Sequence, residues 1–550
     1  MAMPIPILVL LAPLLYGQGW IGEVVMILLP FRNPPSGIAY FIIPSTEQTR
    51  VFNSLPFALA LLTSRPEWAI GGFIVSTWIL TAAITYLVAR RLFPEDPRLA
   101  LLAFYIAGTS AYDISLLQTA YLPLFMAALL HWVGLLLLLQ SAECRSRARL
   151  LASSLLQLLS LFTYANAVAA IALGPAIAYA ICRRRTTAAD AYRSARAAAT
   201  AWWPPLAAYL AALAWVAQQP GNYITSLGGL RFEPSWKLSV SVMRLFAENF
   251  NFYDWVDFVP FFGNAPRIIS FGVSIVVTTL SAAAMLFIVS CGREAKEPGV
   301  ERAGTGLLIA ALLAAVLASN FASSLIQLAD INLRTHLVSR LYAAVIIAAA
   351  CAKLLRSRKV VVLVAGGVLT SAYIGVGAWT LVDHANYLVS QWPRFRAELQ
   401  SLDDVIRHVD PDANVVLYVP PGSGYIATVA PWHARPWGLM MRRSDRGFPA
   451  FVHWSPDRGS GCTLEGSSLA CIDESRNVRR ILVAKTVVVH YDPHDCRIKV
   501  VTDRWMDNTI SLPADYQPRR WLRESADEPT ELIQKLLYAP VRASVGDGCP

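Results

Sequence analysis

Long runs without a charged side chain are the feature of this sequence that most restricts its fold. Runs of 20 or more largely apolar residues recur before residue 383, at 68–89, 199–218, 268–292, 303–329 and 360–382. A helix rises about 1.5 Å per residue, so each run is long enough to cross a hydrocarbon core of about 30 Å. The N-terminal run and further runs at 99–112, 121–140, 150–164, 165–182 and 337–352 complete the set. We therefore expect a polytopic α-helical membrane protein with about eleven transmembrane helices.

The density of charge changes near residue 383. Over the whole chain 15% of residues are charged, whereas ordinary soluble domains have about 25%. The deficit lies before residue 383, which predicts a transmembrane helical domain over 1–382 and a soluble domain over 383–550. In the second part, "ANVVLYVPP" (413–421) is typical of a strand, and "ILVAKTVVVHY" followed by "CRIKVVT" indicates a β-hairpin. With the helix expected over 387–409, this part is predicted to be a small α/β domain.

The distribution of basic residues predicts the orientation of the chain in the membrane. With the N-terminus inside, the inside connections carry 18 Lys or Arg in 47 residues, and the outside connections carry 8 in 102. This bias follows the positive-inside rule, and an odd number of crossings then places 383–550 outside. We expect a bacterial inner (plasma) membrane protein with a cytoplasmic N-terminus and a periplasmic or extracellular C-terminal domain. The net charge of +10 is explained by basic residues that lie beside anionic lipid. No nucleic-acid partner is therefore expected.

Four cysteines fall within the predicted external domain, namely Cys462, Cys471, Cys496 and Cys549. Four thiols in an oxidising compartment indicate two disulfides. Cys462 and Cys471 form the pair that closes most easily, although all three pairing schemes stay open. No spacing of cysteine and histidine resembles a zinc site, so no metal site is predicted.

Two outer connections are expected to lie at the membrane interface. The connection 31–67 is too interrupted to span the bilayer and too apolar to leave it. The connection 219–266 holds "AENFNFYDWVDFVPFF", whose aromatic rings favour the level of the lipid headgroups. Asp254 and Asp257 lie among these rings.

Polar groups near the outer ends of the apolar runs are the candidate functional residues. Soluble-enzyme motifs such as a P-loop, a dinucleotide fingerprint or a zinc-protease helix are missing from the sequence. Ionisable residues at membrane depth are costly and therefore indicate function. Glu23 and Asp113 are candidate catalytic bases for an acceptor hydroxyl, and Arg340 is the candidate ligand for a lipid phosphate. Further candidates for substrate binding are Arg334, His336, Glu47, Arg50, Asp254 and Asp257.

The order of these segments resembles the GT-C superfamily of polyprenyl- or dolichyl-phosphate-sugar-dependent membrane glycosyltransferases. The resemblance lies in a first helix that ends near an acid, an interfacial first outer loop, the stretch "ARRLFPEDPRLALLAFYIAGTSAYD", and "HLVSRLYAAVIIAAA", which opens with an Arg-aromatic pair. It implies a sugar donor carried on polyprenyl phosphate, an acidic catalytic base in the first outer loop and often a second acid in the next outer turn. Glu23 and Asp113 are the positions that match. No motif assigns a cofactor, and a divalent cation stays open.

Each candidate also has a simpler interpretation. Glu23 can be an interfacial acid that reaches water, Asp113 a helix cap, and Arg340 the partner of Asp330 or of lipid headgroups. His131 is expected to be a hydrogen-bonded core histidine rather than a proton relay. Two other functions stay open, namely a transporter, flippase or polymerase of lipid-linked sugars, and a non-catalytic degenerate family member that anchors the external domain.

Overall fold

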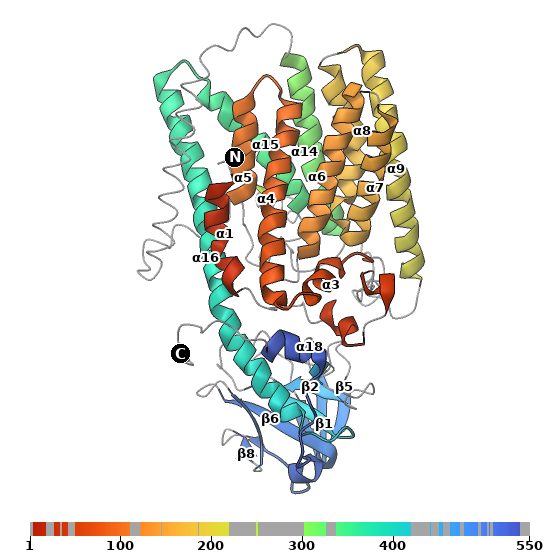
Figure 1. Ribbon diagram of the computed structural model, residues 1–550, viewed down its shortest axis with the longest axis vertical. Coiled ribbons are helices and arrows are strands. Elements are labelled where there is room, and N and C mark those ends of the chain that lie inside the picture. The colour runs from red at the N-terminus through yellow and green to blue at the C-terminus, as the bar shows by residue number, and fades with distance from the viewer. Residues whose placement is uncertain are drawn as a thin grey trace.

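A long helical bundle and a small sheet-containing domain form the two ends of the molecule (Figure 1). The computed structural model describes residues 4–17, 27–33, 36–41, 50–109, 122–144, 146–184, 186–218, 249–250, 302–325, 337–419, 440–441, 450–454, 462–472, 478–492, 497–502, 505–506 and 510–538. The first described residues lie in the bundle, and among the described residues α16 (Val360–Ile406) carries the chain from the bundle to the small domain.

Ten helices of the described residues build the bundle, and most of them coincide with the predicted apolar runs. They are α1 (Ile5–Gly17), α4 (Pro66–Leu92), α5 (Pro97–Thr109), α6 (Leu122–Cys144), α7 (Arg147–Thr163), α8 (Val168–Arg183), α9 (Ala188–Ala217), α14 (Arg302–Leu325), α15 (Leu337–Leu355) and α16 (Val360–Ile406). Within the described part of the chain, α4, α6, α8 with the turn before it, α15 and α16 are long and apolar enough to cross a membrane. The protein is therefore an integral membrane protein. The expected run 268–292 lies outside the described residues, so the number of about eleven spans stays a prediction.

Arginine-rich turns meet at the end of the bundle that lies away from the small domain. Arg184, after α8, forms an ion pair with Glu95, in the turn between α4 and α5. Arg356, after α15, lies 2.7 Å from the neighbouring Asp96 carboxylate. Three turns that the charge pattern assigns to one side of the membrane are thus in contact with one another. We call this the arginine end of the bundle, and the opposite end the domain end.

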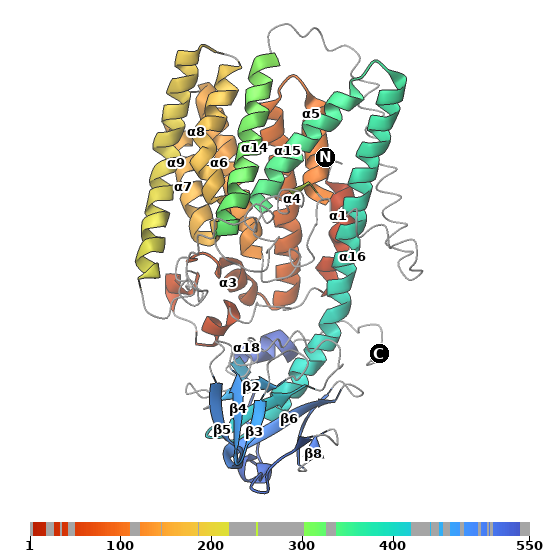
Figure 2. The same ribbon diagram turned by 180° about the vertical axis from the view of Figure 1, so that it is seen from behind.

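Short helical pieces of the connection 31–67 lie between the bundle and the small domain (Figures 1 and 2). They are η1 (Leu29–Arg32), η2 (Gly37–Phe41) and α3 (Leu55–Leu61), and each is too short to cross a bilayer. The Phe52 amide donates to the Phe162 carbonyl at 3.2 Å, which ties this connection to the end of α7. The described pieces agree with a segment that lies along the membrane surface.

Helix α16 joins the bundle to the small domain without a break. Its 47 residues extend over about 70 Å, which is twice the thickness of a hydrocarbon core. The change of composition near residue 383 therefore falls inside one helix. The residues after 383 are richer in charged side chains, but they continue the same helix. The second half of α16 packs against the domain sheet, where Ser401 Oγ accepts a hydrogen bond from the Ile498 amide at 2.8 Å.

The small domain is built on a mixed sheet with strand order β2-β1-β6-β7. Its strands are β1 (Asn414–Tyr418), β2 (Phe451–Trp454), β6 (Thr486–Asp492) and β7 (Arg497–Val500). β1 runs parallel to both β2 and β6, and β6 and β7 are antiparallel. The predicted strand and hairpin are therefore confirmed. A second sheet of β3 (Cys462–Glu465), β4 (Ser468–Ile472) and β5 (Val478–Leu482) lies beside it, with the short pair β8 (Trp505–Met506) and β9 (Ile510–Ser511) (Figure 2).

The two faces of the mixed sheet belong to different apolar cores, because successive strand residues point to opposite sides. Val415, Leu417 and Val489 belong to the core that includes α16 and the bundle. Val416 and Val488 belong to a second core shared with β3, β4 and β5. The domain is thus layered as helix, mixed sheet and second sheet.

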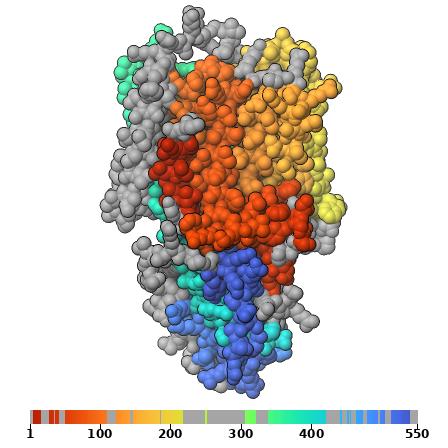
Figure 3. All heavy atoms as spheres, in the orientation of Figure 1, coloured from red at the N-terminus to blue at the C-terminus, as the bar shows by residue number. Residues whose placement is uncertain are grey.

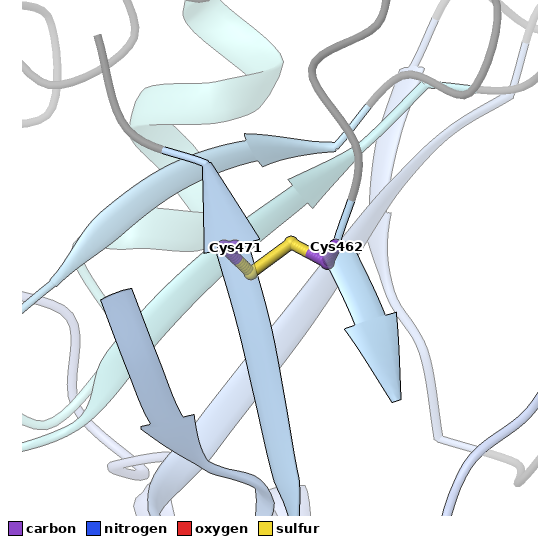
Figure 4. Close-up of a disulfide and its surroundings, with 2 residues drawn as sticks. All are labelled: Cys462 and Cys471. Atoms are coloured by element: carbon purple, nitrogen blue, oxygen red, sulfur yellow. A yellow bond between two sulfur atoms is a disulfide. The ribbon is translucent and has the colours of Figure 1, made fainter. Parts of the chain in front are cut away.

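A disulfide joins Cys462 to Cys471 in the second sheet (Figure 4). The two cysteines are directly opposite in the antiparallel register of β3 and β4. The predicted pairing is confirmed, while Cys496 and Cys549 lie outside the described residues. In the described part of the bundle, Cys182 and Cys351 are free thiols.

The last described residues are wedged between the bundle and the domain. They form α18 (Glu531–Ile533) and the π-helical turn η13 (Gln534–Tyr538), and Ile533, Leu536 and Leu537 are fully buried. In the space-filling view this C-terminal segment lies directly against the N-terminal part of the bundle (Figure 3). The Tyr538 hydroxyl donates to Asp403 at 2.9 Å. Burial, and then the Asp403 carboxylate, raise the pKa of the Tyr538 phenol above its usual value.

Candidate functional site

Two of the predicted site residues, Arg340 and Arg50, belong to the described part of the chain. The other seven lie outside the described residues, namely Glu23, Asp113, Glu47, Arg334, His336, Asp254 and Asp257. Their roles therefore stay predictions, and the site is built from the residues around Arg340.

Arg340 lies in the first turn of α15, and its side chain is only 2% exposed. It lines a pocket together with residues of α4, α5, α6 and α15, namely Trp78, Thr81, Ala107, Phe125, Leu337, Leu341 and Ala344. The empty space among these side chains is about 320 Å³ with open solvent included, and its enclosed part is about the size of one water molecule. Apart from Arg340 and Thr81 the described lining residues are apolar or aromatic, so the guanidinium is the one charged group of this pocket.

The aromatic wall of this pocket is fixed by specific contacts. The Trp78 indole Nε1–H donates to the Gly108 carbonyl at 2.8 Å, which joins α4 to the end of α5. The rings of Trp78 and Phe125 lie with their centroids 4.9 Å apart. The Trp78 indole is held both by this hydrogen bond and by the Phe125 ring, so it has little rotamer freedom. This wall of the pocket is therefore largely preformed.

Arg340 lies deeper in the bundle than the sequence pattern indicates. Trp78 lines the same pocket as Arg340. It lies about 16 Å along α4 from Glu67, which marks the domain end of that helix. The first turn of α15 therefore begins inside the bundle and not at its surface. A cation at such depth is costly, so Arg340 stays a functional candidate.

A chain of uncharged polar side chains holds the same turn of α15. Ser339 donates to Asn249 Oδ1 at 2.9 Å, and Asn249 Nδ2 donates to Asn320 Oδ1 at 2.9 Å. All three side chains are buried. Uncharged polar side chains carry no strong signal in an apolar sequence, and the one sign of this cluster there is that Asn320 interrupts an apolar run. These contacts fix the position from which Arg340 extends into the pocket.

His131 belongs to a packed polar network in the bundle core. Its Nδ1 lies 2.8 Å from Gln157 Oε1, and its Nε2 lies 2.9 Å from the Tyr342 hydroxyl. Nearby, Trp202 Nε1–H donates to Ser153 Oγ at 2.8 Å. The expectation of a hydrogen-bonded core histidine is confirmed.

Arg50 lies at a different place on the domain end. Its guanidinium carbon is 3.9 Å from the centroid of the Tyr164 ring, in the turn between α7 and α8. This cation–π contact attaches the connection 31–67 to that turn. Arg50 does not line the Arg340 pocket. A role of Arg50 in substrate binding stays a prediction.

The described residues contain no group of three metal-ligating side chains. Fold and pocket define the class: a mostly helical integral membrane protein with a small disulfide-containing α/β region and a buried cationic pocket in its bundle. Neither a scan against known protein families nor a search of curated proteins gives a match for this chain.

Proposed function

We propose that this protein is a membrane glycosyltransferase that moves a sugar from a polyprenyl-phosphate carrier to an acceptor on the extracytoplasmic side. The observation that carries the proposal is the Arg340 guanidinium, buried in a pocket whose walls are apolar and aromatic. A polyprenyl phosphate combines a long apolar chain with an anion, so it needs both kinds of surface in one place. A guanidinium binds two phosphate oxygens at once and stays charged at any physiological pH.

In the proposed reaction, Arg340 binds the donor phosphate and stabilises the charge that develops on it. The bond between the anomeric carbon and the phosphate oxygen breaks, and the acceptor oxygen forms a new bond to that carbon. A carboxylate removes the acceptor proton, and polyprenyl phosphate leaves. Glu23 and Asp113 are the predicted bases.

The direction of the chain in the membrane is part of the proposal. The arginine end gathers Arg184 and Arg356, and the domain end carries the α/β region with its disulfide. Basic turns favour the cytoplasmic side, and disulfides persist in oxidising compartments. Both tendencies support a bacterial inner-membrane protein with its C-terminal domain in the periplasm or outside the cell.

The proposal is tested with purified full-length protein and a panel of polyprenyl-phosphate sugars, by following release of the sugar from the carrier. Arg340→Ala should lower turnover at least about a hundredfold, and Arg340→Lys should recover part of it because the charge remains without the bidentate fork. Glu23→Gln and Asp113→Asn test the two predicted bases. Arg356→Ala is the matched control, since its half-exposed side chain lies at the arginine end and should leave turnover unchanged.

Two results would overturn the proposal. One is the failure of the wild-type protein to turn over any member of the panel. The other is unchanged turnover in Arg340→Ala while the variant remains folded. Full activity of both Glu23→Gln and Asp113→Asn would remove those two residues as bases and leave the role of Arg340 standing.

A transporter or flippase of lipid-linked sugars is the second candidate, and the depth of Arg340 favours it. Transport requires polar groups inside the bundle, and Arg340 beside Trp78 and Thr81 is such a group. Reconstitution into proteoliposomes separates the two functions. A flippase moves the lipid-linked sugar between leaflets and leaves its bond to phosphate intact, whereas a transferase breaks that bond.

A further inference from the structure

Helix α4 carries an exposed stripe along one of its faces. Trp68, Leu80 and Leu87 are 40%, 51% and 40% exposed, and exposed or half-buried residues at 72, 76 and 83 lie between them. Steps of three or four residues place this whole set on one side of the helix. Since α4 is long and apolar enough to cross a membrane, the stripe is the side that lies against lipid.

The two ends of the stripe mark the two surfaces of the membrane. Trp68 lies in the first turn of α4, and the exposed Arg90 and Arg91 lie in its last turn. Arg90 follows Trp68 by about 33 Å of helix, which is close to the thickness of about 30 Å of a hydrocarbon core. Tryptophan and arginine are also the side chains that favour membrane interfaces. The membrane surface at the domain end therefore passes near Trp68.

Arg65, the residue directly before α4, is an exposed cation at this level. Its guanidinium carbon lies 5.0 Å from the centroid of the Trp68 ring. Within the described part of the chain, the guanidinium donates no hydrogen bond and forms no ion pair, and the Trp68 indole N–H has no acceptor. Glu67 interacts electrostatically with Arg65, but it is buried and its larger cationic interaction comes from Arg396. The donors of Arg65 and Trp68 are thus available to a ligand.

Apolar side chains are exposed just before Arg65. Leu59, in α3, is 41% exposed, and Leu62, directly after α3, is 64% exposed. The other face of α3 is buried, including Phe57 and Leu61. Figure 1 shows α3 beside the domain end of α4. At this end of the bundle, exposed leucines, an exposed indole and a cation without an ion pair of its own therefore occur within ten residues of sequence.

We propose that Arg65 and Trp68 bind the headgroup of an anionic phospholipid in the leaflet at the domain end. A guanidinium forms paired hydrogen bonds with a phosphate, and an indole N–H donates one more. The acyl chains of the same lipid lie along the stripe of α4, which continues from Trp68 into the hydrocarbon core. A lipid in a bilayer is also held by its neighbours, so the site requires no enclosed cavity.

This lipid site is separate from the Arg340 pocket. The pocket contacts α4 through Trp78 and Thr81, which are buried, whereas the stripe is exposed. The lipid site therefore does not rest on the proposed function, and it applies equally to a transferase, a transporter or an anchor.

The test is photo-crosslinking of the full-length protein in bilayers that contain equal amounts of phosphatidylglycerol and phosphatidylcholine with the same acyl chains. Benzoylphenylalanine replaces Leu62, and mass spectrometry identifies the adducts. We expect lipid adducts that favour phosphatidylglycerol by about fivefold, because a surface cation contributes about 1 kcal/mol to binding of an anionic lipid. Arg65→Ala should abolish the preference, and Arg65→Lys should keep most of it.

Two controls accompany the test. Arg480→Ala removes an exposed arginine of the second sheet, which pairs with Glu465, and should leave the preference unchanged. Benzoylphenylalanine in place of Leu210, a 46% exposed residue of α9, should give lipid adducts without a preference. The sequence has no Lys or Arg at 197–230, so this second probe lies on a helix face without a nearby basic residue in sequence.

Four results would overturn the lipid site. Adducts of the Leu62 probe with a second copy of the chain would make this surface a contact between copies, and adducts within the same chain would show that another segment covers it. Equal labelling of the two lipids would mean that the headgroup charge is not recognised. A preference that persists in Arg65→Ala, in a variant whose melting temperature shows that it is folded, would remove Arg65 from the site.

Discussion

Nε2 of His131 lies 2.9 Å from the phenol oxygen of Tyr342, so a buried hydrogen bond joins α6 to α15. Gln157 Nε2 donates to the His131 carbonyl, which orients the amide so that its Oε1 accepts from Nδ1. Nε2 is then the acceptor for the Tyr342 hydroxyl. Tyr342 lies in the same helical turn as Arg340, so this bond helps to set the rotation of α15 in the bundle.

Tyr342→Phe should therefore destabilise the protein by about 1–3 kcal/mol, because Nε2 of the fully buried His131 loses its donor. The measurement is the apparent melting temperature in detergent. Tyr192→Phe is the control, since Tyr192 is 66% exposed and should give no change. Equal melting temperatures for the two variants would show that the bond contributes nothing.

Helices and strands could be predicted where the signal is local. An apolar run of sufficient length predicts a spanning helix by itself, and α4, α6 and α15 confirm this. The hairpin of β6 and β7 was visible because β-branched residues cluster in it. The continuity of α16 is not evident from the sequence, because charge rises within a helix that goes on.

The site could be predicted only in part because tertiary packing creates it. Arg340 is visible as a charge beside an apolar run, but its aromatic neighbours Trp78 and Phe125 are ordinary residues of other runs. Its depth depends on where α15 begins relative to α4, which no local pattern reports. In the same way, the sequence left three cysteine pairings open, and the register of β3 with β4 selects Cys462–Cys471.

Close packing of glycine against tryptophan gives a second prediction. A Cβ added at Gly174 would lie 2.1 Å from the ring of Trp202, which is fully buried and bonded to Ser153. Gly174→Ala should thus cost about 1–3 kcal/mol of stability through overpacking. Gly72 is the matched helical control, because nothing lies within 4 Å of its added Cβ. Gly72→Ala should raise stability by about 0.5–1 kcal/mol. Melting temperatures that shift in the same direction would contradict this packing argument.

The disulfide gives a third prediction. Cys462 and Cys471 are separated by 9 residues, and closing such a loop stabilises a domain by about 2–3 kcal/mol. The double change Cys462→Ala and Cys471→Ala should lower the stability of the C-terminal domain by this amount, and a reductant should reproduce the effect in the wild type. Limited proteolysis followed by detection of the C-terminal fragment reports on the domain alone. Cys182→Ala, in the bundle, should leave the fragment pattern as it is.

The fourth prediction concerns the joint between bundle and domain. Arg396 of α16 donates from Nε to the Leu537 carbonyl at 2.5 Å, and Gln400 donates to the same oxygen at 2.6 Å. Arg396 also interacts electrostatically with Glu67 of α4, and both side chains are more than nine-tenths buried. One guanidinium thus donates to the C-terminal segment and interacts electrostatically with the bundle.

Arg396→Met should be destabilising, by about 1–3 kcal/mol, because it removes a donor to the buried Leu537 carbonyl and the larger of two cationic interactions of Glu67, the other coming from Arg65. Combining it with Glu67→Gln should recover much of the loss, since the second change removes the uncompensated charge. The measurement is a double-mutant cycle on melting temperature, together with the rate at which protease cuts between bundle and domain. Lys535→Met is the control: its partner Glu531 is exposed, so the change should cost at most about 1 kcal/mol. Additive effects of the Arg396 and Glu67 changes would mean that the two residues do not stabilise one another.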